Sequence, residues 1–378
     1  MLEFRRMITI PNKPYWILGI CASLALVVIL VVYFGGNAST VESEILPLNF
    51  PKAPEEKIAD PQVSLIAVGD IMLSRVVGSK MTKYGDYRYP FLKTADLLKS
   101  ADLTFGNLES PLTPGREILT GEIAFRADPE VTEGLTYAGF DVLTLANNHI
   151  LNFGRQGLEN TFKYLKEAEI DFIGAGETAA DAYQPLIKEV QGIKFAFLAY
   201  SYTDSNSSQV ALMDSAKMSE AAKQAKEQAD FVIVTMHAGT EYQFVPNKHQ
   251  KEFAHQAIEA GATLVIGHHP HVVETVEEYQ GGYIIYSLGN FVFDQMWSQG
   301  TREGMVVKIV FKKEGITELE FHPVIIEDYS QPRFASDSEA ERIIARLDLE
   351  LKKETLNQIP SYKFLMPEAD PPRVENLK

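Results

Sequence analysis

From Val63 onward, short apolar runs alternate with segments whose apolar residues recur at the spacing of an amphipathic helix. Residues 63–68 and 142–146 are typical of buried strands, and Leu158, Phe162 and Leu165 then fall on one face of a helix. Further strands are expected at residues 194–199, 231–236, 263–266 and 283–288. This alternation predicts an α/β fold with buried strands.

The later part of the chain predicts different elements. A helix over residues 248–260 is expected to end at Gly261, and residues 306–311 and 319–324 are typical of an antiparallel hairpin. A charged helix near residues 338–355 and an open tail are expected to follow. We therefore divide the chain into a short N-terminus (1–14), an anchor (15–35), a linker (36–60), a main domain (61–328) and a C-terminal helix and tail (329–378).

An apolar run over residues 15–34 is long enough to cross a membrane as a helix, which needs about 20 residues. Arg5, Arg6 and Lys13 precede it, so the positive-inside bias places the N-terminus in the cytoplasm. A cleaved signal peptide is the alternative, but its apolar region would be shorter. The sequence thus predicts a single-pass protein of the cell membrane with a large extracellular domain.

Composition narrows the classes of partner. The net charge is −16, whereas phosphate backbones are bound by basic surfaces, so we expect no nucleic acid partner. The single cysteine, Cys21, lies inside the apolar run, so the outer domain has no disulfide. Residues 36–60 carry Pro47, Pro51 and Pro54 without a clear period and are typical of a stiffened linker.

The polar residues of greatest interest each follow directly on an expected strand. In α/β sheets, ligands bind at the carboxyl ends of strands, where these side chains would converge. Carboxylates, amides and imidazoles in one place suit two divalent cations such as Mn²⁺, Fe²⁺ or Zn²⁺. The segments at these strand ends are Gly69-Asp70, Gly106-Asn107-Leu108-Glu109, Asn147-Asn148-His149, His237, Gly267-His268-His269-Pro270-His271 and Gly289-Asn290.

Each segment also has a purely structural interpretation. Asp70 is suited to cap the next helix, and Asn147-Asn148 would serve as a turn pair. A lone His237 is more often a buried histidine with its hydrogen bonds satisfied than a metal ligand. Only the joint placement of these residues at strand ends favours a metal site.

The order of five stretches resembles the metallophosphoesterase (calcineurin-like) superfamily and, more specifically, the bacterial CapA/PgsA family of capsule and poly-γ-glutamate synthesis proteins. The resemblance covers roughly residues 63–328. It implies a metallophosphatase-like fold, in which a layered β-sheet sandwich is flanked by helices and preceded by one transmembrane helix. The five stretches are 69–75 (GDIMLSR), 106–112 (GNLESPL), 146–149 (ANNH), 267–272 (GHHPHV) and 286–294 (YSLGNFVFD).

The resemblance also implies roles for individual residues. His149 would donate a proton to a leaving group, and Arg75 and Asn290, which lie next to the ligands in the motifs, would hold a substrate anion. Glu109 would bridge two divalent ions. The metal ligands that it implies are Asp70, Glu109, Asn107, Asn148, His237, His269 and His271.

This chain departs from the superfamily pattern at three places. Met72 stands where a metal-binding histidine is usual, so one metal position lacks a ligand or has a different shape. The stretch from Asn107 to Glu109 replaces a bridging aspartate, and Asn152 stands where the family more often has an aspartate.

Three functions remain open at this point. The first is a metal-dependent hydrolase in capsule synthesis outside the cell. The second is a non-catalytic subunit that binds or guides an anionic polymer such as poly-γ-glutamate beside other membrane subunits of a polymer synthase. The third is a membrane-tethered phosphoesterase unrelated to capsule, whose anchor only sets its location.

Overall fold

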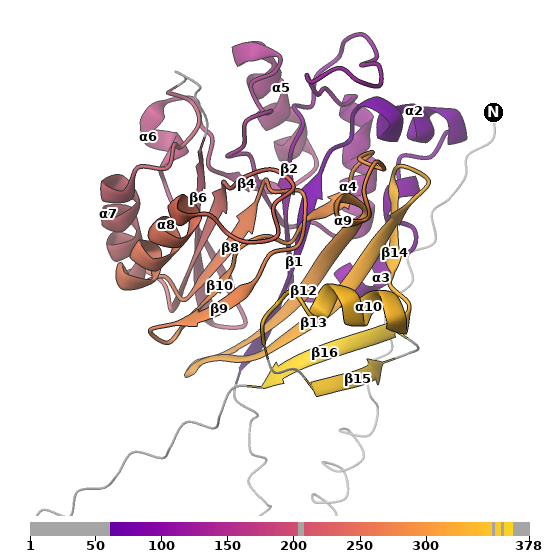
Figure 1. The fold of residues 1–378 in the computed structure, drawn as a ribbon. Helices are drawn as coiled ribbons and strands as arrows, with labels where there is room; N and C mark the ends of the chain where they lie inside the picture. Colours follow the sequence, from indigo (N-terminus) through magenta and orange to yellow (C-terminus); the bar gives the residue numbers. More distant parts are fainter. Residues whose placement is uncertain (1–60, 203–207, 350–351, 357–358, 366–378) are drawn as a thin grey trace, which may run out of the picture. The chain divides into compact units, whose positions relative to one another are not determined.

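The alternating pattern folds into two β-sheets with helices packed against them in a computed structural model (Figure 1). The structure describes residues 61–202, 208–349, 352–356 and 359–365, which belong to one compact unit. The expected anchor and linker lie outside the described residues and stay predictions, and the expected tail is described only over residues 356 and 359–365. No helix of the described part is long and apolar enough to cross a membrane.

The larger sheet has β1 near its middle, with parallel partners on one side and antiparallel partners on the other. Within it, β11 is a parallel neighbour of β1, and β14 pairs with β13. In spatial order its main path is β15 (Lys352–Leu356), β16 (Ile359–Leu365), β13 (Gly315–Glu327), β12 (Glu303–Lys312), β1 (Gln62–Ile71), β2 (Leu103–Leu108), β3 (Val142–Thr144) and β4 (Asp171–Ile173), with β11 (Asn290–Val292) and β14 (Gln331–Phe334) beside it.

The smaller sheet has a parallel centre and antiparallel edges. Its strands β6, β7 and β8 are buried along nearly their whole length, as is usual for parallel strands covered on both faces. In spatial order the strands are β5 (Leu186–Val190), β6 (Ile193–Ser201), β7 (Phe231–His237), β8 (Leu264–His268), β10 (Gly282–Ile285) and β9 (Val276–Tyr279).

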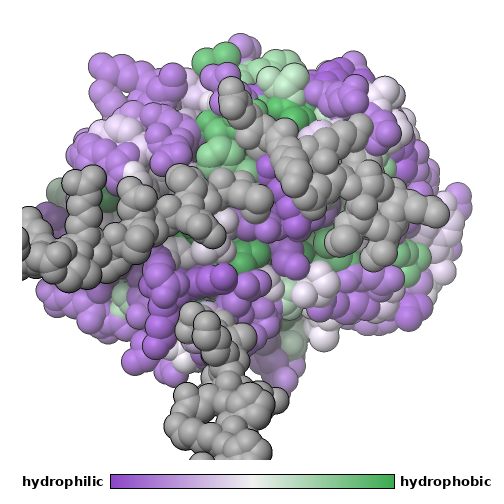
Figure 2. Space-filling view, turned by 90° about the horizontal axis from the view of Figure 1, so that it is seen from below, coloured by the Kyte–Doolittle hydropathy of each residue, from purple (hydrophilic) through white to green (hydrophobic). Residues whose placement is uncertain are grey.

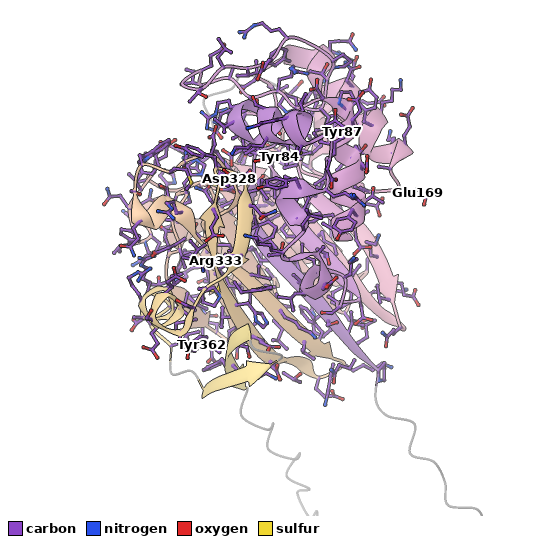
Figure 3. The ribbon with its side chains drawn as sticks, turned by 90° about the vertical axis from the view of Figure 1, so that its right-hand side faces the viewer. Tyr84, Tyr87, Glu169, Asp328, Arg333 and Tyr362 are labelled. Atoms are coloured by element: carbon purple, nitrogen blue, oxygen red, sulfur yellow. The ribbon has the colours of Figure 1, made fainter. Side chains whose placement is uncertain are left out.

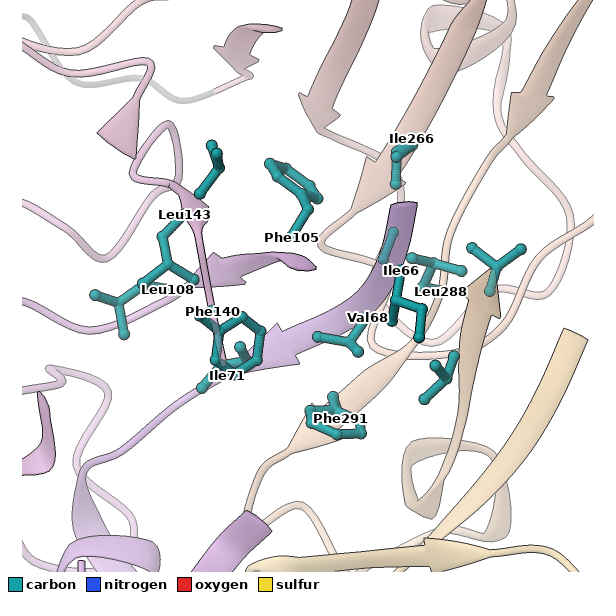
Figure 4. Packing of buried hydrophobic residues seen from close by; sticks show 14 of the residues in the cluster. Ile66, Val68, Ile71, Phe105, Leu108, Phe140, Leu143, Ile266, Leu288 and Phe291 are labelled. Carbon is teal, nitrogen blue, oxygen red and sulfur yellow. The ribbon is translucent and has the colours of Figure 1, made fainter. Parts of the chain in front are cut away.

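Aromatic rings from both sheets meet in one hydrophobic core. Phe105 on β2 stacks with Phe197 on β6 at a centroid distance of 6.2 Å, and Phe195 meets Phe311 on β12 edge-on at 5.0 Å. Figure 4 shows the part of this core around β1, where side chains of the larger sheet and Ile266 of β8 gather. The two sheets therefore pack face to face.

The helices lie against the sheets through apolar stripes. Met218 and Ala222 of α7 and Phe253 and Ala257 of α8 form a second core with alternate residues of the smaller sheet. Helix α8 begins with a capping box between Asn247 and Gln250. The helices are α2 (Arg75–Tyr84), α3 (Ala95–Leu98), α4 (Thr132–Ala138), α5 (Gly154–Glu167), α6 (Ala179–Ala182), α7 (Ser215–Lys226), α8 (Lys248–Glu259), α9 (Gln299–Arg302) and α10 (Asp337–Ile344), with single 3₁₀ turns at Tyr89–Phe91 and Pro129–Val131.

Most of the expected elements are present. The helix predicted at 248–260 is α8, which is followed by Gly261 with a φ of 110°. The expected hairpin is β12 and β13, and both strands are longer than the pattern indicated. The strands expected at 142–146 and 283–288 end earlier, as β3 and β10.

The C-terminal expectation was wrong in part. The charged helix ends at Ile344 as α10, residues 352–355 of the expected helix belong to strand β15, and strand β16 lies in the expected open tail. Strand β16 pairs with β13, and Tyr362 is buried in the main core. Tertiary pairing along the free edge of β13 therefore outweighs the helical propensity of a charged segment.

A cluster of polar contacts holds α2 against the turn between β13 and β14. Asp328 forms an ion pair with Lys80 and accepts a hydrogen bond from the hydroxyl of Tyr89 at 2.9 Å. Tyr84 and Asp328 lie next to each other in Figure 3, and the Tyr84 hydroxyl is 3.4 Å from the carboxylate. Nearby, Arg333 joins Glu327 to Glu339 of α10, so α10 is tied to the sheet as well.

Figure 2 shows the end of the domain at which β1 begins, and the coloured residues seen there are mostly hydrophilic with hydrophobic areas between them. Isolated apolar residues on a surface are usual and need no partner. Together with the net charge of −16, this indicates an ordinary solvated exterior at that end.

We predict that Phe105→Ala lowers the free energy of unfolding by about 3–5 kcal/mol, because it opens a cavity between the two sheets. Urea denaturation measures the change. Phe244→Ala is the matched control, since Phe244 is 42% exposed, and we expect it to cost less than about 1 kcal/mol. Equal losses in the two variants would show that the sheets do not depend on this aromatic contact.

Candidate metal centre

The predicted site residues meet at one edge, where parallel strands of both sheets end. Asp70 lies at the end of β1, and Glu109 follows β2 in the larger sheet. His237 ends β7, and the histidine loop (residues 268–271) follows β8 in the smaller sheet. The backbone N–H of His269 donates to Asp70 Oδ2 at 3.3 Å, so the two edges are in direct contact.

Close backbone approach fixes the position of Asp70. The Asp70 N–H donates to the carbonyl of Gly289 at 2.9 Å, just before β11. A Cβ on Gly69 would lie 2.0 Å from that same carbonyl oxygen, so only glycine fits there. Gly289 itself has a φ of 68°, a conformation that favours glycine.

Asp70 is a fully buried carboxylate with two strong partners. Asn107 donates its side-chain N–H to Oδ1 at 2.8 Å, and Nδ1 of His271 is 3.1 Å from Oδ2. Burial alone would raise the pKa of Asp70, but the hydrogen bond from His271 and the charges of His271 and His268 outweigh it and leave the pKa below its usual value. Asp70 therefore remains an ionised carboxylate at neutral pH.

Glu109 is also fully buried, but its environment is the opposite. Its Oε1 accepts no hydrogen bond within the described part of the chain. That oxygen lies 3.8 Å from His149 Nε2, 3.8 Å from His271 Nε2 and 4.0 Å from His237 Nε2. Burial, and then the negative charge of Asp70, raise the pKa of Glu109 well above its usual value. An unsatisfied buried carboxylate oxygen costs stability, and a cation at this point would satisfy it.

Two histidines of the cluster, His237 and His269, are kept neutral. Burial, followed by the charges of neighbouring histidines, lowers the pKa of His237 well below its usual value and that of His269 to about 4. Neutral imidazole is the form that binds metal ions. Asp70, Glu109 and His237 each place one ligand atom within 4.8 Å of the others, which fits a single cation.

Three asparagines support these ligands. Asn107 presents its NH₂ to the carboxylates, and its oxygen accepts from Asn147 at 3.0 Å. Asn148 Oδ1 lies 2.9 Å from His237 Nε2, so these two predicted ligand atoms are adjacent. In this orientation Asn107 positions the carboxylates, and its role as a ligand stays a prediction. Asn147 is suited to anchor its loop because its oxygen also accepts from the His149 N–H.

His149 lies at the entrance to the cluster. Its ring stacks on Phe125 at a centroid distance of 3.9 Å, and Nδ1 is 3.0 Å from Asn152 Oδ1. Burial lowers the pKa of His149 to about 4, although the hydrogen bond with Asn152 opposes the shift. The imidazole is therefore neutral at pH 7, with Nε2 directed toward Glu109. Asn152 thus orients His149 where the family more often has an aspartate.

The two residues expected to hold a substrate anion already have protein partners. Arg75 forms a bidentate ion pair with Asp294 and also donates to the Glu122 carbonyl at 3.1 Å. Asn290 is fully buried and holds Nδ1 of His271 through its oxygen at 3.0 Å. Both residues lie at the site, and in this structure each positions a neighbour.

Sequence reasoning missed two contributors to this site. Glu241, in the loop after β7, places its carboxylate within 4.8 Å of the ligand atoms of His269 and His271. Phe125 forms the wall behind His149. A single acid or aromatic residue in a loop carries no periodic signal, so only the spacing of Glu241 after His237 was available as a clue.

A buried pair lies behind the histidine loop. Gln250 of α8 donates to Glu274 Oε2 at 2.6 Å, and its amide also packs against Gly239 in the loop after β7. Burial raises the pKa of Glu274 to about 8, although the hydrogen bond from Gln250 lowers it in part. At neutral pH this carboxyl group is therefore largely protonated.

The class of protein follows from this geometry: a two-sheet α/β protein with a buried carboxylate–histidine cluster at its strand ends. Its donors are oxygen and imidazole nitrogen, the set that suits divalent cations such as Mn²⁺, Fe²⁺ and Zn²⁺. The unpartnered Glu109 oxygen among three imidazoles is where such an ion would fit.

Comparison with known proteins gives the family. The family described as "Bacterial capsule synthesis protein PGA_cap" matches residues 64–295, and the chain belongs to this family. It is 31% identical over 319 residues to "Capsule biosynthesis protein CapA" of Bacillus anthracis, covering 80% of this chain and 77% of that protein. It is 33% identical over 307 residues to "PGA biosynthesis protein CapA" of Bacillus subtilis, covering 79% of this chain and 80% of that protein.

Among solved structures, a phosphatase from Mycoplasma pneumoniae matches 75% of this chain and 97% of its own. The TM-score is 0.49 and the sequence identity is 14%. A likeness of that degree is too low to establish a shared fold or a shared chemistry.

We predict that Glu274→Gln flattens the pH dependence of stability. The folded protein keeps a proton on Glu274 that the unfolded chain releases above pH 4.5, so stability falls as pH rises toward 8. Between pH 5 and pH 9 the free energy of unfolding of the wild type should fall by roughly 3–5 kcal/mol more than that of the variant. Urea denaturation at both pH values measures this, with Glu278→Gln on the exposed face of β9 as control. Parallel pH curves for the wild type and Glu274→Gln would contradict the prediction.

Proposed function

We propose that this protein is a metal-dependent hydrolase of capsule polymer synthesis that acts outside the cell with two divalent cations. The observation that carries the proposal is the fully buried Glu109 carboxylate, whose Oε1 accepts no hydrogen bond from the described residues and lies among three histidines. Membership in a family of bacterial capsule synthesis proteins supports the biological setting.

Asp70, Glu109 and His237 would hold a cation in the buried position, and Asn148 adjoins it through His237. Bound cations would lower the pKa of a water molecule and neutralise the oxygens of a phosphate ester or amide. The chain's own groups supply orientation: Asn107 fixes Asp70, and Asn290 fixes His271. We assign ligand positioning to Asn107 and Asn290 on these contacts.

His149 is the group best placed to move a proton. Phe125 and Asn152 hold its ring, and Nε2 points into the cluster 3.8 Å from Glu109. Because the imidazole is neutral at pH 7, Nε2 would accept a proton from the attacking water and deliver it to the leaving group. Arg75 adds positive charge near the site, although Asp294 neutralises much of it.

The substrate class that we propose is an anionic capsule polymer or its precursor. The printed name of the Bacillus subtilis relative refers to PGA biosynthesis, which supports poly-γ-glutamate for this chain. The net charge of −16 would repel an anionic polymer, so the cations bound at the site would have to attract it.

The test uses the purified full chain in detergent. We expect about two divalent ions per chain by elemental analysis, and turnover of a model phosphodiester or a γ-glutamyl substrate. His149→Ala should lower kcat by about 10²–10⁴ without loss of bound metal. His255→Ala is the control, because His255 pairs with Glu277 on a different face of the smaller sheet. Full activity in His149→Ala would show that His149 does not transfer the proton.

A non-catalytic role in the same polymer synthesis system is the second candidate. Met72 in place of a metal histidine and the engagement of Arg75 by Asp294 favour it. On this alternative the domain binds the polymer and assembles with other membrane subunits of a polymer synthase. Wild-type protein without bound metal, together with capsule restored to a deletion strain by the Asp70→Ala variant, would decide for this role.

We also propose that the apolar run at residues 15–34 anchors the protein in the cell membrane with the site outside. Its length and the preceding basic residues support this orientation. Protease added to intact cells without their wall should then digest the domain and leave the N-terminus protected. Protection of the whole chain until the membrane is permeabilised would show that the domain lies on the cytoplasmic side.

A further inference from the structure

We propose that Glu241, His269 and His271 form an outer cation position, next to the buried position formed by Asp70, Glu109 and His237. This inference rests on the proposed metal function and assigns to Glu241 the ligand that the sequence lacks at Met72. Its ligand would be a borderline divalent cation, since one carboxylate and two imidazoles suit Mn²⁺, Fe²⁺ or Zn²⁺.

The end of β1 supplies a single ligand to the cluster. Met72 is fully buried in the hydrophobic core, and its sulfur accepts from the backbone N–H of Ser74 at 3.1 Å. The thioether is thus occupied within its own turn and is a poor ligand for these cations. The second cation position therefore requires a donor from another element.

Glu241 reaches the cluster from the loop after β7. Its carboxylate and the ligand atoms of His269 and His271 all lie within 4.8 Å of one another. The Nδ1 atom of His269 is buried without a hydrogen-bond partner among the described residues, so it is available to an ion. These three residues thus form a second group with the spacing of the buried one, with one carboxylate and two imidazoles where the buried group has two carboxylates and one imidazole.

Two backbone hydrogen bonds fix the Glu241 loop on the histidine loop. Ala238 N–H donates to the His268 carbonyl at 3.0 Å, and Tyr242 N–H donates to the Pro270 carbonyl at 2.8 Å. Glu241 lies between these two attachment points, so its backbone cannot move away without breaking one of them. The Tyr242 ring also stacks against His271 at a centroid distance of 6.2 Å.

The same place collects uncommon backbone conformations. His269, His271 and Tyr242 have φ values of 97°, 59° and 65°, which side-chain-bearing residues rarely adopt. Such strain costs about 1–3 kcal/mol per residue and gathers at binding sites, where the rest of the fold enforces it. Here it turns two histidines and the Glu241 loop toward one point.

The two positions differ in exposure and share Glu109. The buried position is enclosed, whereas Glu241 is exposed, so the outer ion would be open to solvent and substrate. Glu109 Oε1 lies 4.0 Å from His237 of the buried group and 3.8 Å from His271 of the outer group. Glu109 is thus placed to bridge the two ions, and the outer ion should exchange more readily.

The experiment is calorimetric titration of Mn²⁺ into the metal-free full chain in detergent. We expect two ions in the wild type and one in Glu241→Gln, or an affinity for the weaker ion reduced by about 100-fold or more. Electron paramagnetic resonance of the Mn²⁺-loaded protein should show spin coupling between two ions in the wild type and an isolated ion in the variant. Asp70→Asn should instead remove the buried ion.

The matched control is Glu252→Gln, an exposed glutamate of α8 that pairs with Lys248 and should leave both ions in place. Since Glu241 is exposed, its variant should keep the wild-type unfolding midpoint without metal. Two ions bound with wild-type affinity in Glu241→Gln, or the loss of both, would overturn the outer position. A wild type that binds no Mn²⁺ would overturn the proposed metal function itself, and the outer position with it.

Discussion

The contact between Asp70 and His271 is the interaction on which the site depends, because it joins the two sheets at their working edge. Asp70 belongs to the larger sheet and His271 to a loop of the smaller one, and their side chains meet at 3.1 Å with both residues buried. The His269 N–H reinforces the junction from the same loop. Any sliding of one sheet over the other would separate these groups, so the aromatic packing between the sheets also preserves the geometry of the cluster.

Two carboxyl groups with oxygens within 4.8 Å of each other have pKa values shifted in opposite directions because their neighbours differ. Asp70 receives hydrogen bonds and stays ionised, whereas Glu109 has one unsatisfied oxygen and a raised pKa. A cation would lower the pKa of Glu109 and release its proton, so metal binding and proton release would be linked. The low pKa values of His237 and His269 keep these two imidazoles neutral, which is the form that binds a metal ion.

The place of this site at the strand ends was predictable from sequence, whereas the roles of its individual residues were not. Buried apolar runs followed by Asp70, Glu109 and His237 placed these residues at strand ends, and the structure brings them together. The contribution of Glu241 depends on two loops meeting in space, which no local pattern encodes. Strand β16 was missed because β13, the strand on which it pairs, lies outside the C-terminal segment, and β15 in turn depends on β16.

The direction of β1 separates the start of the described chain from the chemistry. β1 begins at Gln62 and reaches the cluster at Asp70, so about 26 Å of extended backbone lies between them. Whatever precedes Pro61 therefore joins the domain at the edge away from the cluster. A tether attached there would hold the domain by the end of β1 that lies away from the cluster, so a long polymer bound at the cluster would not have to pass the point of attachment.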